Sequence, residues 1–361
     1  MNMLEATSWA NFNDSWLHDL LQFSSLGFAL FYIIQNKYTI KELFRLLLLN
    51  AIGILCFISS GYTGLLMTML TITLLPKRSL DKILHMILRE ESVIFILIVL
   101  LSAVGLLNNR EIDINKGTYI ANAISLGFAH PNMLAAQGTS IVLLFLCVNR
   151  KSLKRRYILF SFISILIIYF FAKGRTSLLL GLFSISLIAI HKRHSVTKAI
   201  LRILPWIYVL VLTGLVSFMF IYVYYGENAP IVKIINDLIF NGRIGLAYRS
   251  LLVYPVTLFG KALDMSYWND YQYFTLDNGQ VMVLLEYGIV GFLAYFVVIQ
   301  KTLKQIGKEK EVVLAITMIV FIIWSMYEGT MYFIGKNFAL LFIGTSDIFN
   351  IKHDRTKGEI R

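Results

Sequence analysis

The sequence predicts an all-α polytopic integral membrane protein, and three observations support this fold class. Of the 361 residues, 57% are hydrophobic and only 15% are charged, with a mean hydropathy of +0.70. Soluble domains carry charge on about a quarter of their residues, so this composition is typical of a chain embedded in lipid. Apolar runs near the ~20-residue length of a membrane span recur along the chain, and basic residues gather in alternate connections between them.

Counting these runs predicts about 11 transmembrane helices (10–12) in a single membrane-embedded domain, residues 1–361. No internal repeat and no Pro/Gly/Ser-rich linker divides the chain. The longest connection covers residues 225–278. The expected spans are 20–34, 43–60, 62–75, 93–107, 133–148, 157–172, 176–190, 203–224, 279–299, 312–327 and 337–349.

Charge predicts the orientation of these spans. Six alternate connections hold 24 of the 33 Lys and Arg residues. Because basic connections stay in the cytoplasm, we expect the N-terminus outside, the C-terminus in the cytoplasm and the 225–278 loop outside. The net charge of +12 is then explained by topology, which argues against a nucleic-acid partner.

Several classes of site are disfavoured by what the sequence lacks. No cytoplasmic connection carries a phosphate-binding glycine motif or is long enough for a nucleotide-binding domain, which argues against ATP-driven transport and nucleotide-sugar chemistry. Cys56 and Cys147 lie in separate apolar runs without metal-ligand spacing. Glu111-x-Asp113 has no third ligand nearby and is interpreted as a solvated loop. We therefore expect no metal and no cofactor.

The long loop is predicted to contain short helices. Apolar residues recur at helical spacing over 230–240, which predicts an amphipathic helix on the membrane surface that stops at Gly242. A second helix is expected from Arg243 to Tyr254, ending before Pro255. The aromatic and amide cluster at 267–274 fits a carbohydrate platform and a membrane-interface belt equally well.

Five ionisable residues fall within or beside the apolar spans, where charge is costly and usually functional. Under the expected topology all of them lie in the outer half of the bilayer, which predicts a site that opens outward. They are Lys173, Arg175, Glu286, Glu328 and Lys336.

The turn Lys173-Gly174-Arg175 separates two short spans, so its cations should lie near headgroup depth. Arg binds phosphate oxygens in a bidentate manner, and Gly174 would allow the backbone to approach a ligand closely. The alternative is that both cations snorkel to lipid headgroups. Upstream, His130 and Asn132 could bind a sugar or phosphate, or simply cap the helix that starts there.

Two carboxylates lie in or near the span at 279–299. Asp277 is a plausible general base toward a sugar hydroxyl, or an N-cap. Glu286 is expected to orient an Arg such as Arg175. Gly288 and Gly291 are interpreted as close helix packing.

These motifs resemble the O-antigen and capsule polymerases (Wzy type) and the related O-antigen ligases. The matching pieces are Ser125-Leu126-Gly127-Phe128-x-His130-Pro131-Asn132, Gly174-Arg175-Thr176, Asn241-Gly242-Arg243 with Gly260, and Asp277-Asn278 before Gly288-x-x-Gly291. The ligases have His where this chain has Asp277, which favours the polymerase. The resemblance implies that Arg175 and Arg243 or Arg249 bind a lipid diphosphate without metal.

The sequence thus predicts a polysaccharide repeat-unit polymerase at the outer face of a bacterial plasma membrane. It would transfer a polyprenyl-diphosphate-linked glycan (such as one on undecaprenyl diphosphate) onto a lipid-linked repeat unit, with a flippase and a chain-length regulator as partners. The alternatives are a ligase-like transferase or a lipid-linked oligosaccharide flippase. Expected catalytic residues are Asp277, Arg175 and Glu286; expected substrate-binding residues are Arg110, His130, Asn132, Lys173, Arg243, Arg249 and Asn278.

Overall fold

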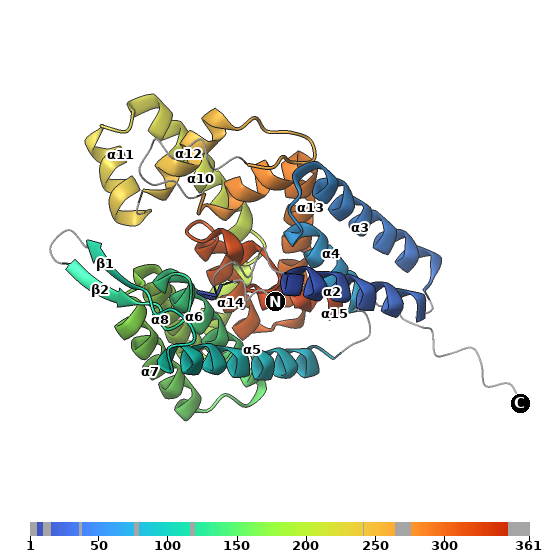
Figure 1. Cartoon of the computed structure of the whole chain (residues 1–361), viewed down its shortest axis with the longest axis horizontal. Helices are drawn as coiled ribbons and strands as arrows, with labels where there is room; N and C mark the ends of the chain where they lie inside the picture. Colours follow the sequence, from blue (N-terminus) through green and yellow to red (C-terminus); the bar gives the residue numbers. More distant parts are fainter. Residues whose placement is uncertain are drawn as a thin grey trace, which may run out of the picture.

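The computed structural model describes residues 6–9, 16–35, 38–75, 79–115, 120–240, 242–263 and 276–345, and they are almost all helical (Figure 1). The helices are α2 (Trp16–Gln35), α3 (Ile40–Ser60), α4 (Gly64–Leu74), α5 (Leu80–Ala103), α6 (Pro131–Val148), α7 (Arg155–Ala172), α8 (Arg175–Ile190), α9 (His194–Ile203), α10 (Ile207–Tyr225), α11 (Pro230–Ile234), α12 (Arg243–Val253), α13 (Gly279–Glu309), α14 (Val312–Trp324) and α15 (Leu341–Thr345). The aromatic cluster at 267–274 lies outside the described residues.

The helices confirm a helical membrane protein but not the expected number of spans. Within the described residues, five helices are long and apolar enough to cross a membrane, namely α3, α6, α7, α10 and α13. Shorter apolar helices include α4, α8 and α14. The last expected span, 337–349, is not one helix: a 3-10 turn (Phe338–Leu340) leads into the five-residue α15.

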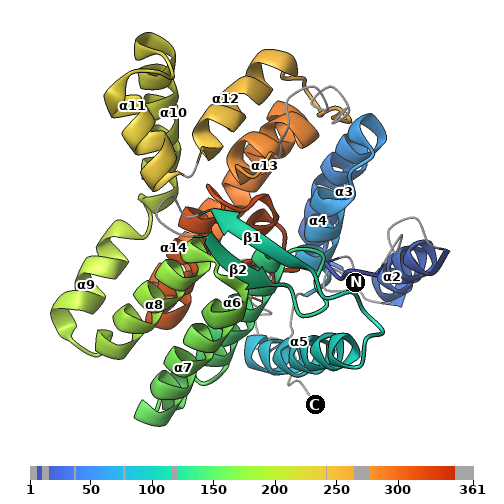
Figure 2. The same ribbon diagram turned by 60° about the vertical axis from the view of Figure 1, so that its left-hand side comes forward.

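The chain after α14 forms a buried segment in the middle of the molecule. The 13 residues of α14 cover about 20 Å, which is short of a ~30 Å hydrocarbon core. Residues 325–340, here called the central segment, then run between two groups of helices. Figures 1 and 2 show this red part of the chain between α6 and α8 on one side and α4 and α13 on the other.

A β-hairpin was not predicted. Strands β1 (Glu111–Asn115) and β2 (Ile120–Ile124) pair antiparallel, with Glu111 opposite Ile124. Glu111 and Asp113 are exposed on it, and no group of three or more possible metal ligands occurs in the described ranges.

The segment from Ser125 to Asn132, which follows the hairpin, has a structural role. Gly127 has a φ of +89° and lies so close to Ile98 that a Cβ would be 2.9 Å from its carbonyl oxygen. Its own carbonyl accepts a hydrogen bond from the N–H of Ser8 at 2.8 Å. The motif therefore holds the chain near its start against α5.

Helix α13 breaks at Gly288, where φ is +69° and ψ is −173°. The irregular stretch 257–261 fills the break: the backbone N–H of Ile289 donates to the carbonyl of Thr257 at 3.0 Å, and that of Lys261 donates to the carbonyl of Leu285 at 3.2 Å. At Gly260 a Cβ would lie 1.9 Å from the carbonyl oxygen of Glu286. Gly288 therefore supplies a positive φ and also serves close packing, but against this stretch rather than against a helix: a Cβ there would lie 2.3 Å from the backbone nitrogen of Gly260.

Gly291, one turn further along α13, does serve close packing. A Cβ there would lie 3.2 Å from Leu65 of α4 and 3.3 Å from Cys56 of α3. In this motif, Gly288 thus interrupts helix α13, and Gly291 allows α13 to pack closely against α3 and α4.

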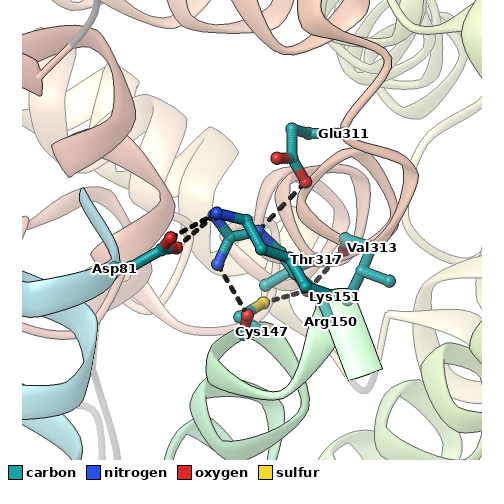
Figure 3. Close-up of polar contacts among 7 residues, drawn as sticks. All are labelled: Asp81, Cys147, Arg150, Lys151, Glu311, Val313 and Thr317. Atoms are coloured by element: carbon teal, nitrogen blue, oxygen red, sulfur yellow. Dashed lines mark hydrogen bonds and ion pairs between the residues drawn. The ribbon is translucent and has the colours of Figure 1, made fainter. Parts of the chain in front are cut away.

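A buried arginine, Arg150, links three segments of the chain through ion pairs and a hydrogen bond (Figure 3). The Arg150 side chain is 5% exposed and forms ion pairs with Asp81 at 2.6 Å and Glu311 at 3.0 Å. It also donates to the Cys147 carbonyl at 2.9 Å. These residues come from three connections that the charge pattern assigns to one side of the membrane, so their contact agrees with the predicted alternation.

Candidate active site

Two predicted site residues from distant parts of the chain form an ion pair. Arg243 is the first residue of α12, and Asp277 lies two residues before α13 begins. Arg243 Nε donates to Asp277 Oδ2 at 3.1 Å, and the two side chains are 12% and 27% exposed. The terminal amino groups of Arg243 donate to no other residue within the described ranges, so this guanidinium is held through Nε.

Asp277 is available for this contact because its neighbour caps the helix. Asn278 Oδ1 accepts from the backbone N–H groups of Gln280 and Val281, and Nδ2 donates to the Met326 carbonyl. Asn278 is fully buried. These contacts give it a structural role, and its direct binding of substrate stays a prediction. The N-cap alternative for Asp277 was wrong.

His130 is the second element of the site. It is the N-cap of α6, and its Nδ1 accepts from the backbone N–H of Asn132 at 3.0 Å. Burial lowers the pKa of His130; Arg110 adds to this effect and the carboxylate of Glu328 opposes it. A neutral imidazole that accepts at Nδ1 carries its proton on Nε2, so His130 presents an N–H donor. Capping does not use the Asn132 side chain.

The turn after α14 lies next to both the Arg243–Asp277 ion pair and His130. The Tyr327 ring stacks on Phe240 with centroids 5.7 Å apart, and the charge of Arg243 acts on its hydroxyl. The next residue, Glu328, acts electrostatically on His130. Both residues border the site, and the sequence signal for Glu328 is its position at a membrane span.

The tip between α7 and α8 lies beside the start of α6. A Cβ on Gly174 would be 2.8 Å from the Ala135 methyl, so the glycine serves helix packing, and the close approach of a ligand there stays a prediction. Lys173 has a left-handed φ of 52°, and its ammonium lies 4.7 Å from the Phe170 ring centroid. Arg175 is exposed at the first position of α8. Its binding of phosphate stays a prediction.

Arg249 forms an ion pair with a carboxylate other than Asp277. Its guanidinium pairs with Glu227 at 2.7 Å, and both side chains are about half exposed. Arg243 and Arg249 therefore contact different carboxylates. Of the two, Arg243 is the better candidate for binding a diphosphate.

Glu286 lies at the break in α13 and is 9% exposed. Its charge acts on the hydroxyls of the surrounding tyrosines Tyr62, Tyr287 and Tyr295. It forms no ion pair with any residue in the described part of the chain, so the expected contact with Arg175 is not made there. It is a buried carboxylate in a tyrosine-lined setting.

Comparison with known proteins supplies no further identification. No family model, no curated protein and no solved structure matches the chain.

Proposed function

We propose that this protein is a membrane glycosyltransferase that polymerises lipid-linked polysaccharide repeat units. The donor is a glycan on a polyprenyl diphosphate, and the acceptor is a hydroxyl of a second lipid-linked repeat unit. The reaction takes place at the outer face of the plasma membrane. With no nucleotide-binding motif in the chain, a preactivated lipid diphosphate supplies the driving force.

The observation that carries the proposal is the Arg243–Asp277 ion pair. Glycosyl transfer from a diphosphate requires a fixed cation for the leaving group and a base for the attacking hydroxyl. The pair provides a guanidinium held at Nε, whose terminal amino groups donate to no other described residue, and a carboxylate 3.1 Å from it. Its position beside Tyr327 joins it to the group formed by Arg110, His130 and Glu328.

The proposed step forms one bond and breaks one. The acceptor hydroxyl oxygen attacks the anomeric carbon of the donor, and the bond from that carbon to the diphosphate oxygen breaks. The diphosphate leaves with the bonding electron pair, and Arg243 and Arg175 stabilise its charge. The hydroxyl proton passes to Asp277.

The test is polymerisation by the purified full-length chain in lipid nanodiscs, with the lipid-linked repeat unit as substrate. Arg243→Ala should lower the rate about 100-fold, as loss of a fixed transition-state donor does. Arg249→Ala is the matched control and should keep nearly full activity, because this arginine pairs with Glu227. Equal rates for both variants would overturn the role of Arg243.

Asp277→Asn separates the two roles of Asp277. The amide oxygen still accepts from Arg243 but cannot take a proton. We expect Asp277→Asn to be as inactive as Asp277→Ala. An Asn variant that retains most activity would mean that Asp277 only positions Arg243.

A flippase for lipid-linked oligosaccharides is the second candidate, and the break in α13 favours it. Transporters often place their sites at discontinuous helices, and here buried Glu286 lies next to such a break. Movement of a labelled lipid-linked repeat unit across vesicles containing the protein, without polymer formation, would select this function.

A further inference from the structure

A group of polar side chains is buried where α6 faces the central segment. Gln137 of α6 is 1% exposed, Asn337 is 3% exposed, and the neighbouring Lys336 is also buried. The amide oxygens of Gln137 and Asn337 accept no hydrogen bond from any residue that the structure describes. Buried polar groups in folded proteins are nearly always paired, so two unpaired amides in one region require an explanation.

The two amides lie on facing elements that are bonded to each other. Ser140 Oγ donates to the Lys336 carbonyl at 3.0 Å, which places α6 against the residue before Asn337. Gln137 precedes Ser140 by three residues and is therefore about 60° from it around the helix. Gln137 thus lies on the same side of α6 as Ser140, one turn nearer the start of the helix.

This location lies along α6 from the candidate active site. His130 and Gln137 are seven residues apart, so they lie within about 20° of each other around α6 and about 10 Å apart along it. Phe333 packs on Tyr287 at 6.2 Å between ring centroids, which holds the other side of the central segment against α13 near Glu286. The amides are thus below His130, in the interior of the helix bundle.

We propose that Gln137 and Asn337, with Lys336, form a subsite that binds a sugar ring of the lipid-linked substrate. The subsite rests on the proposed function and extends it. Unpaired amide oxygens need donors, which a sugar hydroxyl supplies, and the same hydroxyl accepts from an amide N–H or an ammonium group. A fully ionised diphosphate has no proton to donate, so the amide oxygens favour the glycan over the phosphates.

The experiment measures binding by the purified full-length chain in nanodiscs with two probes. One is the lipid-linked oligosaccharide extracted from cells in which the gene is deleted; the other is polyprenyl diphosphate without sugar. Gln137→Met and Asn337→Leu remove the polar atoms and nearly keep side-chain volume. Gln305→Met makes the same change at another buried glutamine, near the Arg150 end of the molecule.

We expect each subsite variant to bind the glycan-bearing probe about tenfold more weakly, with unchanged binding of the sugar-free lipid. Gln305→Met should change neither. Thermal stability of Gln137→Met and Asn337→Leu should equal or exceed that of the wild type, because an unpaired polar group is removed.

Three results would overturn the subsite. Unchanged binding of both probes, or an equal loss for both, would mean that the amides do not contact the glycan. A large loss of thermal stability in both variants would mean that they hold structural water. If the wild-type protein binds neither probe, the proposed function itself fails, which differs from failure of the variants alone.

Discussion

Replacement of Arg150 by Met should destabilise the protein far more than the same change at its neighbour Lys151. Arg150 is 5% exposed and pairs with both Asp81 and Glu311, whereas the Lys151 side chain is 68% exposed and, among the described residues, pairs with Asp81 alone. Removing one partner of a buried ion pair costs about 3–5 kcal/mol, because it leaves charge uncompensated. Exposed ion pairs contribute about 0–1 kcal/mol.

The two carboxylates around Arg150 are one quarter to one third exposed, so we expect the lower end of that range, about 3 kcal/mol. For a chain of this size the unfolding temperature should fall on the order of 4 °C, and by less than about 2 °C for Lys151→Met. The assay is thermal unfolding in detergent at fixed salt. Adding Asp81→Asn and Glu311→Gln to Arg150→Met should restore part of the loss.

Equal shifts for Arg150→Met and Lys151→Met would refute this reasoning. So would a result in which neutralising both carboxylates lowers stability further. Either result would mean that the three connections are not held together by the buried guanidinium.

Three further predictions concern the rest of the molecule. Gly288→Ala should prevent correct folding, since the φ of Gly288 is +69° and a Cβ would lie 2.3 Å from the backbone nitrogen of Gly260. The control Gly214→Ala has open space around the new Cβ and should be neutral or slightly stabilising in a detergent-stability assay. Because burial lowers the pKa of His130, the unfolded chain binds more protons than the folded protein just below pH ~6.5, and stability should fall there. The variant His130→Asn still caps α6, and its unfolding temperature should depend less on pH between about 7.5 and 5. Arg175→Lys keeps the charge but loses bidentate geometry, and should lower polymerisation about tenfold without changing the unfolding temperature.

Local sequence signals predicted the elements that depend on local physics. The expected helix from Arg243 to Tyr254 is α12, Arg243–Val253, because Pro255 cannot continue it. The amphipathic stretch at 230–240 is α11 followed by a π-helical turn, Ile235–Ile239. The strand β1 also had a local signal: Glu-Ile-Asp-Ile-Asn alternates polar and apolar residues, which is the period of a strand.

The remaining features depend on contacts between distant residues. The break in α13 exists because the 257–261 stretch supplies the missing hydrogen-bond partners, and nothing in the apolar pattern around Gly288 reports this docking. The Arg243–Asp277 pair joins residues 34 positions apart. The position of the central segment follows from the short length of α14 and from the contact of this segment with Ser140 of α6. Only the length of α14 can be read from hydropathy.

The lipid-linked glycan profile of cells lacking this gene tests the proposed polymerase most directly. We expect single repeat units to accumulate on the lipid at the outer face of the membrane, and wild-type protein but not Arg243→Ala to restore long chains. Full-length chains left on the lipid would mean a ligase. Single units retained on the cytoplasmic face would mean a flippase and would contradict the proposed polymerase.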